Sequence, residues 1–322
     1  MKKILLTCDT EVGLLEVPIR KDAFEVFIEG KINSEEVGYK FINKIASKYK
    51  AKVEHFVDIY AYEKVGEKKF ANLCNNILEM GHNISLHTHP SHKYDSKRKF
   101  MHQYSLAEQK EIIEHGKEKI HEWTKKEVRV HRAGGYGMNL NTLRALKCHD
   151  FKIDCSYFKG HQNCLYQKKV FNRLFLQEGI LEIPVSVFQN NINYWPGAIK
   201  RKVMTKLDFR YGADTNQILR VIEQAPDNVL IVLFLHSFNF LNRFYDFKLK
   251  RFKRITINRK LIIEYEKLLA GIKDRLDCEF ISLDQIDNSD YADDYLVDIN
   301  TARFMGNALL GKVNNLFRNR YV

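Results

Sequence analysis

The stretch VLIVLFLH, at residues 229–236, is the most apolar segment of the chain and the one that best indicates its fold. It follows the turn-forming segment PDN (226–228) and ends at His236. A continuous apolar run of this length is typical of a strand that is buried on both faces. Such strands occur in parallel sheets covered by helices. The stretch therefore predicts a buried parallel strand with a polar residue at its carboxyl end.

Segments with the spacing of strands and of helices alternate along the rest of the chain. Strand patterns lie at 3–7, 53–57, 83–89, 128–131, 151–155, 181–187 and 279–282, and helical patterns at 34–49, 66–80, 105–125, 139–148, 214–224 and 257–272. Ser105 with Glu108 fits a capping box, and Asp214 fits a helix cap. This alternation predicts an α/β fold with a parallel sheet.

We expect a distorted (β/α) barrel of about seven parallel strands, with a doubly wound sheet as the alternative. The barrel is expected to form a single domain over residues 1–284. Residues 285–322 lie outside the alternating pattern and are expected to form a C-terminal extension that packs as an accessory helix.

Composition and charge narrow the classes of partner. Of the 322 residues, 45% are hydrophobic and 29% are charged, which is typical of a globular chain. The net charge of +12 favours anionic partners, although a solvated lysine-rich surface carries the same charge. No known nucleic-acid-binding pattern accompanies the charge, so no nucleic acid is expected. The apolar run near the N-terminus is too short for a signal peptide, and no run is long enough to span a membrane, which predicts a cytoplasmic location.

Polar side chains gather at the predicted ends of two strands. Asp9 and Glu11 end the first strand, and His87 and His89 end the third. Residues two apart on a strand point to the same side, so each pair shares one face. Two imidazoles with one or two carboxylates suit zinc, and also other divalent metals. A lone histidine is more often structural, but the two pairs together predict a metal site.

Two further strand ends carry candidate residues. Arg132 precedes Gly134 and Gly135, and it can hold a carboxylate such as Asp9 in its ionised form. The alternative is an ordinary turn with a surface arginine. His236 directly follows seven apolar residues, and this position at the rim of a sheet favours a general acid or base over a structural histidine.

The order of the motifs CDTE (8–11), GHNISLHTHP (81–90), HRAGGYG (131–137), DCSY (154–157), EIPVS (182–186) and LFLHSF (233–238) resembles the polysaccharide deacetylases. This is carbohydrate esterase family 4, with its NodB homology domain. The resemblance is strongest to the branch found in cell-surface polysaccharide biosynthesis, and it runs from about residue 4 to residue 240.

The resemblance implies metal-dependent removal of an N-acetyl group from a sugar in surface polysaccharide or glycolipid biosynthesis. It implies a catalytic base that is positioned by an arginine, and a histidine that protonates the leaving group: Asp9, Arg132 and His236. It implies ligands for one divalent metal, with zinc expected: Glu11, His87 and His89. It implies substrate contacts at Tyr136, Asp154 and Trp195.

The chain departs from the family pattern at three points. It has DTE where the family has adjacent aspartates, and Gly134 and Gly135 where the family has a proline before the tyrosine. The family's second histidine lies four residues after the first, but here that residue is Ser91. The second ligand is then His89 or His92, and the period of the strand favours His89. Residues 90–104 form a long polar loop, for which we consider the hypothesis of a lid.

Basic stretches at 248–254, 200–206 and 97–99 bear on the substrate. They fit a phosphate- or lipid-linked sugar, or peripheral contact with the inner membrane surface, or a solvated face. Two alternative functions stay open at this point. One is a metal hydrolase of another C–N or glycosidic bond, and the other is a non-catalytic carbohydrate-binding homologue.

Overall fold

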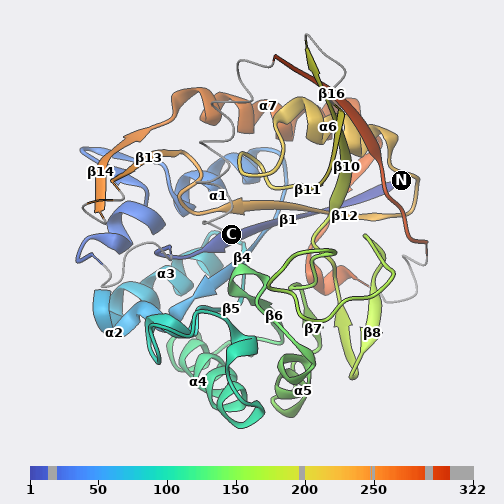
Figure 1. Cartoon of the computed structure of the whole chain (residues 1–322). Coiled ribbons are helices and arrows are strands. Elements are labelled where there is room, and N and C mark those ends of the chain that lie inside the picture. Colours follow the sequence, from blue (N-terminus) through green and yellow to red (C-terminus); the bar gives the residue numbers. More distant parts are fainter. Residues whose placement is uncertain (14–19, 196–199, 247, 249–250, 287–292, 305–322) are drawn as a thin grey trace.

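The computed structural model describes residues 1–13, 20–195, 200–246, 248, 251–286 and 293–304 (Figure 1). Its centre is a nine-stranded sheet in the order β12-β1-β4-β5-β6-β7-β9-β8, with β15 paired to the start of β1. The strands are β1 (Lys2–Thr10), β4 (Val53–Asp58), β5 (Asn83–Thr88), β6 (Val130–Ala133), β7 (Ile153–Asp154), β8 (Phe175–Gln177), β9 (Ile180–Glu182), β12 (Leu230–His236) and β15 (Cys278–Phe280). Only β8 runs antiparallel to its neighbour. The expected α/β fold with a large parallel sheet is confirmed.

The sheet does not close into a barrel through paired strands in the described part of the chain. Its end strands are β12 and β8, and the space beside β12 is bridged by isolated hydrogen bonds. Phe209 N donates to Phe234 O, and Val232 N donates to Ser186 Oγ. The single strand expected at 181–187 is interrupted because Pro184 has no N–H to donate. Instead β9 ends at Glu182, and the next strand begins at Val187.

Helices surround the sheet (Figure 1). They are α1 (Tyr39–Lys48), α2 (Tyr62–Val65), α3 (Glu67–Glu79), α4 (Leu106–Thr124), α5 (Leu140–Cys148), α6 (Thr215–Gln224) and α7 (Arg259–Arg275). The predicted capping box is present at α4, where Ser105 Oγ accepts from Glu108 N and the Glu108 carboxylate accepts from Ser105 N. Asp214 caps α6 as predicted. Short helical turns lie at Phe24–Ile28, Ile59–Ala61, Pro90–His92, Met101–Gln103, Gly134–Tyr136 and Leu283–Gln285.

The two faces of β1 differ, and this difference positions the polar residues. Ile4, Leu6 and Cys8 pack in the large cluster between sheet and helices. Leu5 packs in a smaller cluster on the inner face of the sheet, where Phe56 is also buried. Because side chains alternate along a strand, Thr7 and Asp9 share the inner face with Leu5. The inner face therefore changes from apolar to polar toward the carboxyl ends of the strands.

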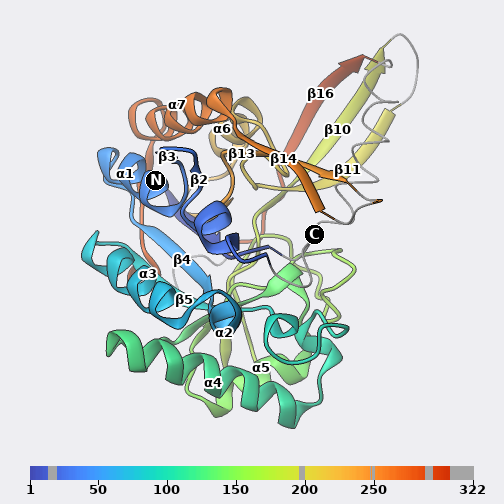
Figure 2. The same cartoon turned by 90° about the vertical axis from the view of Figure 1, so that its left-hand side faces the viewer.

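Three smaller sheets were not predicted. β10 (Val187–Trp195), β11 (Lys200–Lys206) and β16 (Asp298–Phe304) form a separate sheet that projects from the main body (Figure 2). β13 (Leu241–Asp246) pairs with β14 (Arg251–Ile257), and β2 (Lys31–Ile32) pairs with β3 (Glu35–Glu36). The C-terminal extension, expected as a helix, contributes the strand β16, while residues 305–322 lie outside the described residues. None of the described helices combines the length and apolar character needed to cross a membrane.

Candidate active site

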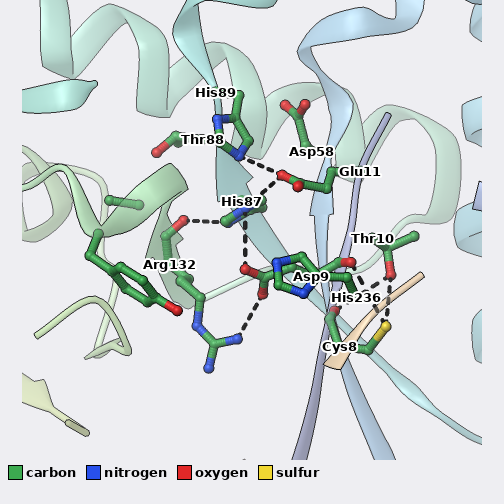
Figure 3. Close-up of polar contacts among 12 residues, drawn as sticks. Cys8, Asp9, Thr10, Glu11, Asp58, His87, Thr88, His89, Arg132 and His236 are labelled. Atoms are coloured by element: carbon green, nitrogen blue, oxygen red, sulfur yellow. Dashed lines mark hydrogen bonds and ion pairs between the residues drawn. The ribbon is translucent and has the colours of Figure 1, made fainter. Parts of the chain in front are cut away.

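Three side chains that can bind a metal meet at the carboxyl ends of β1 and β5 (Figure 3). Glu11 follows β1, His87 lies on β5 and His89 follows that strand. One ligand atom from each residue lies within 4.8 Å of the other two, and all three residues are buried. Glu11 Oε2 is 3.4 Å from His87 Nε2 and 2.5 Å from His89 Nε2. The structure therefore brings together the three residues expected as metal ligands.

The hydrogen bonds of this group fit a metal ion. His87 Nδ1 lies 2.9 Å from the carbonyl oxygen of Arg132. A carbonyl can only accept, so Nδ1 donates and Nε2 is turned toward the carboxylates. His87 Nε2 is buried and has no hydrogen-bond partner, and the buried Glu11 Oε2 has only the imidazoles beside it. Two ligands of a tetrahedral zinc ion lie about 3.3 Å apart, which is close to the 3.4 Å between these two atoms.

The electrostatics of the group favour a cation. Burial raises the pKa of Glu11, but the His89 and His87 imidazoles outweigh burial and hold that pKa well below its ordinary value. Burial lowers the pKa of His87, but the carboxylates of Asp9 and Glu11 raise it to about 9. A positive charge is therefore stable between these side chains, and a metal ion would compete there with a proton.

Asp9 is held beside the metal-binding group by Arg132. Arg132 Nη1 donates to Asp9 Oδ1 at 2.7 Å, and it also lies 3.2 Å from Thr7 Oγ1. The other carboxylate oxygen, Asp9 Oδ2, is 3.5 Å from His87 Nε2. The guanidinium is fully buried, with the rings of Phe56 and Phe234 3.9 and 4.5 Å from its central carbon. One oxygen of Asp9 is thus fixed by an arginine, and the other faces the group that can bind metal.

His236 stands opposite Asp9 because β1 and β12 are parallel neighbours in that register. The two residues lie close together in Figure 3. Burial lowers the pKa of His236, and the carboxylate of Asp208 opposes that effect. Asp208 Oδ2 lies 4.0 Å from His236 Nδ1 and is fully buried. The sequence analysis did not predict Asp208, which reaches the site through an isolated parallel bridge to Phe234.

The glycine turn after β6 closes one side of the site. A Cβ atom on Gly134 would lie 2.3 Å from the ring of His89, so only glycine allows the turn to approach this imidazole. Gly135 and Tyr136 have φ values of +54° and +58°. Tyr136 is buried, and its hydroxyl receives a hydrogen bond from Lys206 at 2.9 Å. The turn therefore presents backbone, rather than side chain, beside the group.

His92, the alternative second ligand, has a different partner. Its Nδ1 lies 2.6 Å from Asp58 Oδ2, and both residues are buried. His89, not His92, belongs to the group of three ligand atoms. The loop that carries His92 is partly packed rather than free, since the short turn Met101–Gln103 contacts the glycine turn through His102 N and Gly137 O.

Of the three expected substrate residues, Asp154 does not reach this group in the described structure. Asp154 is fully buried, and its Oδ1 contacts His131 Nδ1 and Ser156 Oγ at 2.7 Å each. Side chains alternate along a strand, so His131 and its neighbour Arg132 point to opposite sides of the sheet. Asp154 pairs with His131 in the register and therefore faces the side opposite to Arg132. Trp195 ends β10 in the projecting sheet, and its side chain lies outside the described residues. Tyr136, another of the expected substrate residues, lies beside the site.

Comparison with solved structures identifies the fold. A protein of Mycobacterium smegmatis that is assigned to the polysaccharide deacetylases aligns with 88% of this chain and 88% of its own, at 15% identity and a TM-score of 0.52. This chain has the polysaccharide deacetylase fold. The family 4 carbohydrate esterase of Streptomyces lividans, in complex with acetate, aligns with 84% of this chain and 89% of its own, at 12% identity and a TM-score of 0.41.

A mutant of the peptidoglycan deacetylase of Bacillus subtilis aligns with 88% of this chain and 89% of its own, at 13% identity and a TM-score of 0.43. No protein-family model and no curated protein sequence matches the chain. The resemblance inferred from the motif order is thus confirmed at the level of the fold. Within the polysaccharide deacetylase fold, the candidate residues of this chain lie at the carboxyl ends of β1, β5, β6 and β12.

Proposed function

We propose that the protein is a metal-dependent carbohydrate N-deacetylase. The observation that supports this most directly is the position of Asp9. One of its oxygens is fixed by Arg132, and the other faces His87 beside two further ligand candidates. A carboxylate so placed can take a proton from a water molecule, which is the first requirement for hydrolysis of an amide.

Glu11, His87 and His89 would hold the metal, and zinc suits two imidazoles with one carboxylate. A divalent ion at this point supplies a water molecule of lowered pKa and polarises the acetyl carbonyl. The chain itself fixes its ligands before the metal binds. The hydrogen bond from His87 Nδ1 to the Arg132 carbonyl sets the tautomer, and the close packing of Gly134 sets the position of the His89 ring.

Asp9 then acts as the general base. The buried Arg132 binds one oxygen of the Asp9 carboxylate and leaves the other directed toward the metal side of the site. On the opposite side, His236 would donate a proton to the departing sugar amine, with Asp208 as the carboxylate nearest to its Nδ1. The backbone N–H of Tyr136, in the glycine turn, is our candidate for binding the oxyanion. The products would be acetate and a free amino sugar.

The substrate that we propose is an N-acetylated sugar used in surface polysaccharide or glycolipid biosynthesis. The net charge of +12 and the exposed side chains of Lys200, Arg201 and Lys202 suit a phosphate- or lipid-linked form of that sugar. Action in the cytoplasm, at the inner membrane surface, is part of the same proposal. It rests on the charge and the motif order alone.

The test is metal content together with acetate release. Wild-type protein is compared with the His87→Ala/His89→Ala double variant and with a matched His121→Ala/His149→Ala variant, whose histidines lie at helix ends away from the site. We expect about one zinc ion per chain in the wild type and in the matched variant, none in the site variant, and acetate release that follows the metal. Equal metal content in all three proteins, or no acetate from any N-acetyl sugar tested, would overturn the proposal.

A further inference from the structure

Lys206, the last residue of β11, is buried, although the other basic residues of that strand are exposed. Its side chain is 7% exposed, whereas Lys200, Arg201 and Lys202 point to solvent. A buried ammonium group is costly unless it is paired, because it loses its hydration. Such a residue therefore needs an explanation from the groups around it.

Those groups come from two sides of the candidate active site. Lys206 Nζ lies 2.8 Å from Asp208 Oδ2 and donates a hydrogen bond of 2.9 Å to the hydroxyl of Tyr136. It also lies 4.9 Å from the centre of the Phe234 ring, within the range of a cation–π contact. Lys206 thus joins the glycine turn, which carries Tyr136, to the carboxylate that faces His236.

The distances around Asp208 indicate what the ammonium group does. Asp208 Oδ1 accepts a hydrogen bond from Tyr211 N, and Oδ2 is shared between two positively charged or protonatable neighbours. It is 2.8 Å from Lys206 Nζ but 4.0 Å from His236 Nδ1, which is beyond hydrogen-bond range. His236 Nδ1 is buried and has no hydrogen-bond partner. The lysine therefore holds the Asp208 carboxylate near the His236 imidazole but outside hydrogen-bond distance of it.

We propose that Lys206 is a positioning residue for the deacetylation reaction, a role that rests on the proposed function. Its ammonium group fixes Asp208 and the hydroxyl of Tyr136 at the same time. Through Asp208 it keeps a negative charge 4.0 Å from His236 Nδ1, and through Tyr136 it holds the turn that carries our candidate for binding the oxyanion. Removing the ammonium group would free both sides at once, although Lys206 touches no reacting atom.

The experiment uses Lys206→Met, which keeps the length of the side chain but removes its charge. Lys44→Met, which makes the same change at an exposed position of α1, is the control. We expect Lys206→Met to lower kcat up to about 100-fold with little change in KM, because small misplacements of catalytic groups have effects of that size. Lys44→Met should leave kcat unchanged. A Lys206→Met variant with wild-type kcat would overturn the proposal.

A double-mutant cycle with Asp208→Asn separates positioning from damage to the fold. If Lys206 acts in part through Asp208, the loss of kcat in the Lys206→Met/Asp208→Asn protein will be smaller than the two single losses combined, and the double variant also avoids a buried unpaired carboxylate. Additive losses would show that Lys206 acts independently of Asp208 and would refute the link.

A measurement that needs no turnover distinguishes failure of this inference from failure of the proposed function. In protein labelled with ¹⁵N-histidine, the His236 signals are identified by their absence in His236→Gln. We expect Lys206→Met, but not Lys44→Met, to shift the His236 nitrogens. If the wild type releases no acetate but this shift is seen, the proposed function fails and the link from Lys206 to His236 stands. If no shift is seen, the link fails whatever the activity.

Discussion

Two buried groups at neighbouring strand ends are built from the same kinds of side chain but differ in how their polar atoms are satisfied. In the first, Glu11, His87 and His89 meet on one side of β5, and the imidazole nitrogen His87 Nε2 has no hydrogen-bond partner. In the second, on the other side of the same strand, His131 Nε2 contacts Thr88 Oγ1 at 3.0 Å while Nδ1 contacts Asp154. Both nitrogens of His131 are therefore used.

The second group ends at the carboxyl group of Glu182. Burial, followed by the nearby charge of Asp154, raises the pKa of Glu182 well above its ordinary value, which favours the neutral carboxyl. The first group has no such neutral end, because its carboxylate stays ionised and its imidazoles surround it. A buried His–carboxylate cluster thus indicates a metal site when imidazole nitrogens without partners converge on a carboxylate, and a structural network when both nitrogens of the imidazole already have partners.

The largest difference between the groups should appear when one aspartate in each is changed to asparagine. Asp9→Asn removes the proposed base but none of the three ligands, so we expect kcat to fall about 10³-fold with the metal content unchanged. Asp154→Asn makes the same change on the far side of the sheet, and we expect its kcat to stay within about threefold of wild type at temperatures where it is folded. Acetate release and elemental analysis on both variants give the comparison.

If Asp154→Asn were as damaging to kcat as Asp9→Asn in folded protein, Asp154 would have a direct role in the reaction, as the motif resemblance implied. If Asp9→Asn kept its turnover, the role of Asp9 as base would be refuted.

A smaller effect is expected from Gly134→Ala, which would move a metal ligand without removing it. The added methyl group would meet the His89 ring at 2.3 Å, and the buried ring would have to shift. We expect zinc affinity to fall about 10–100-fold, the range found when the support of a ligand is disturbed. Gly271→Ala, in α7, is the control, because a Cβ there would meet only the side chain of Leu219, at 3.1 Å. Competition with a zinc-binding dye measures both; equal affinity of Gly134→Ala and wild type would contradict the role of the turn.

The period of a strand explains which parts of this comparison could be predicted from the sequence. Two residues apart means one shared face, so Asp9 with Glu11 and His87 with His89 were predicted as neighbours, and the structure brings them together. The same rule could have excluded Asp154 from the site, but only with the register that pairs it with His131. A register between strands depends on tertiary packing and is not written in one strand's sequence.

Asp208 and Lys206 were missed for a different reason. Lys206 ends and Asp208 follows β11, a strand that the sequence did not predict, and both reach the site because residues 207–209 hydrogen-bond with Phe234. The helices were predicted more accurately, since caps such as Ser105 and Asp214 are local signals. The predicted closure of the sheet into a barrel is not confirmed, because the break at Pro184 removes the strand that would have continued the sheet.

The smallest effect on the site, and the sharpest test of the second group, is expected from Glu182→Gln. A protonated Glu182 accepts from Tyr157 N at 2.8 Å and donates to Asp154, and a glutamine side chain can do both without a titratable proton. Because the pKa of Glu182 is raised in the folded state above its unfolded value of 4.5, its stabilising contribution is present below pH 4.5 and is lost as the pH rises through the folded pKa.

We expect the wild-type midpoint of thermal unfolding to fall across this range and that of Glu182→Gln to fall less, by a few degrees, since 1 kcal/mol corresponds to roughly 2–4 °C in a chain of this size. Zinc content should be the same in both proteins, because the network lies across the sheet from the ligands. Parallel pH profiles of the two unfolding midpoints would mean that Glu182 is ionised. The proposed contrast, in which the second group holds a proton and the first group binds a metal, would then be wrong.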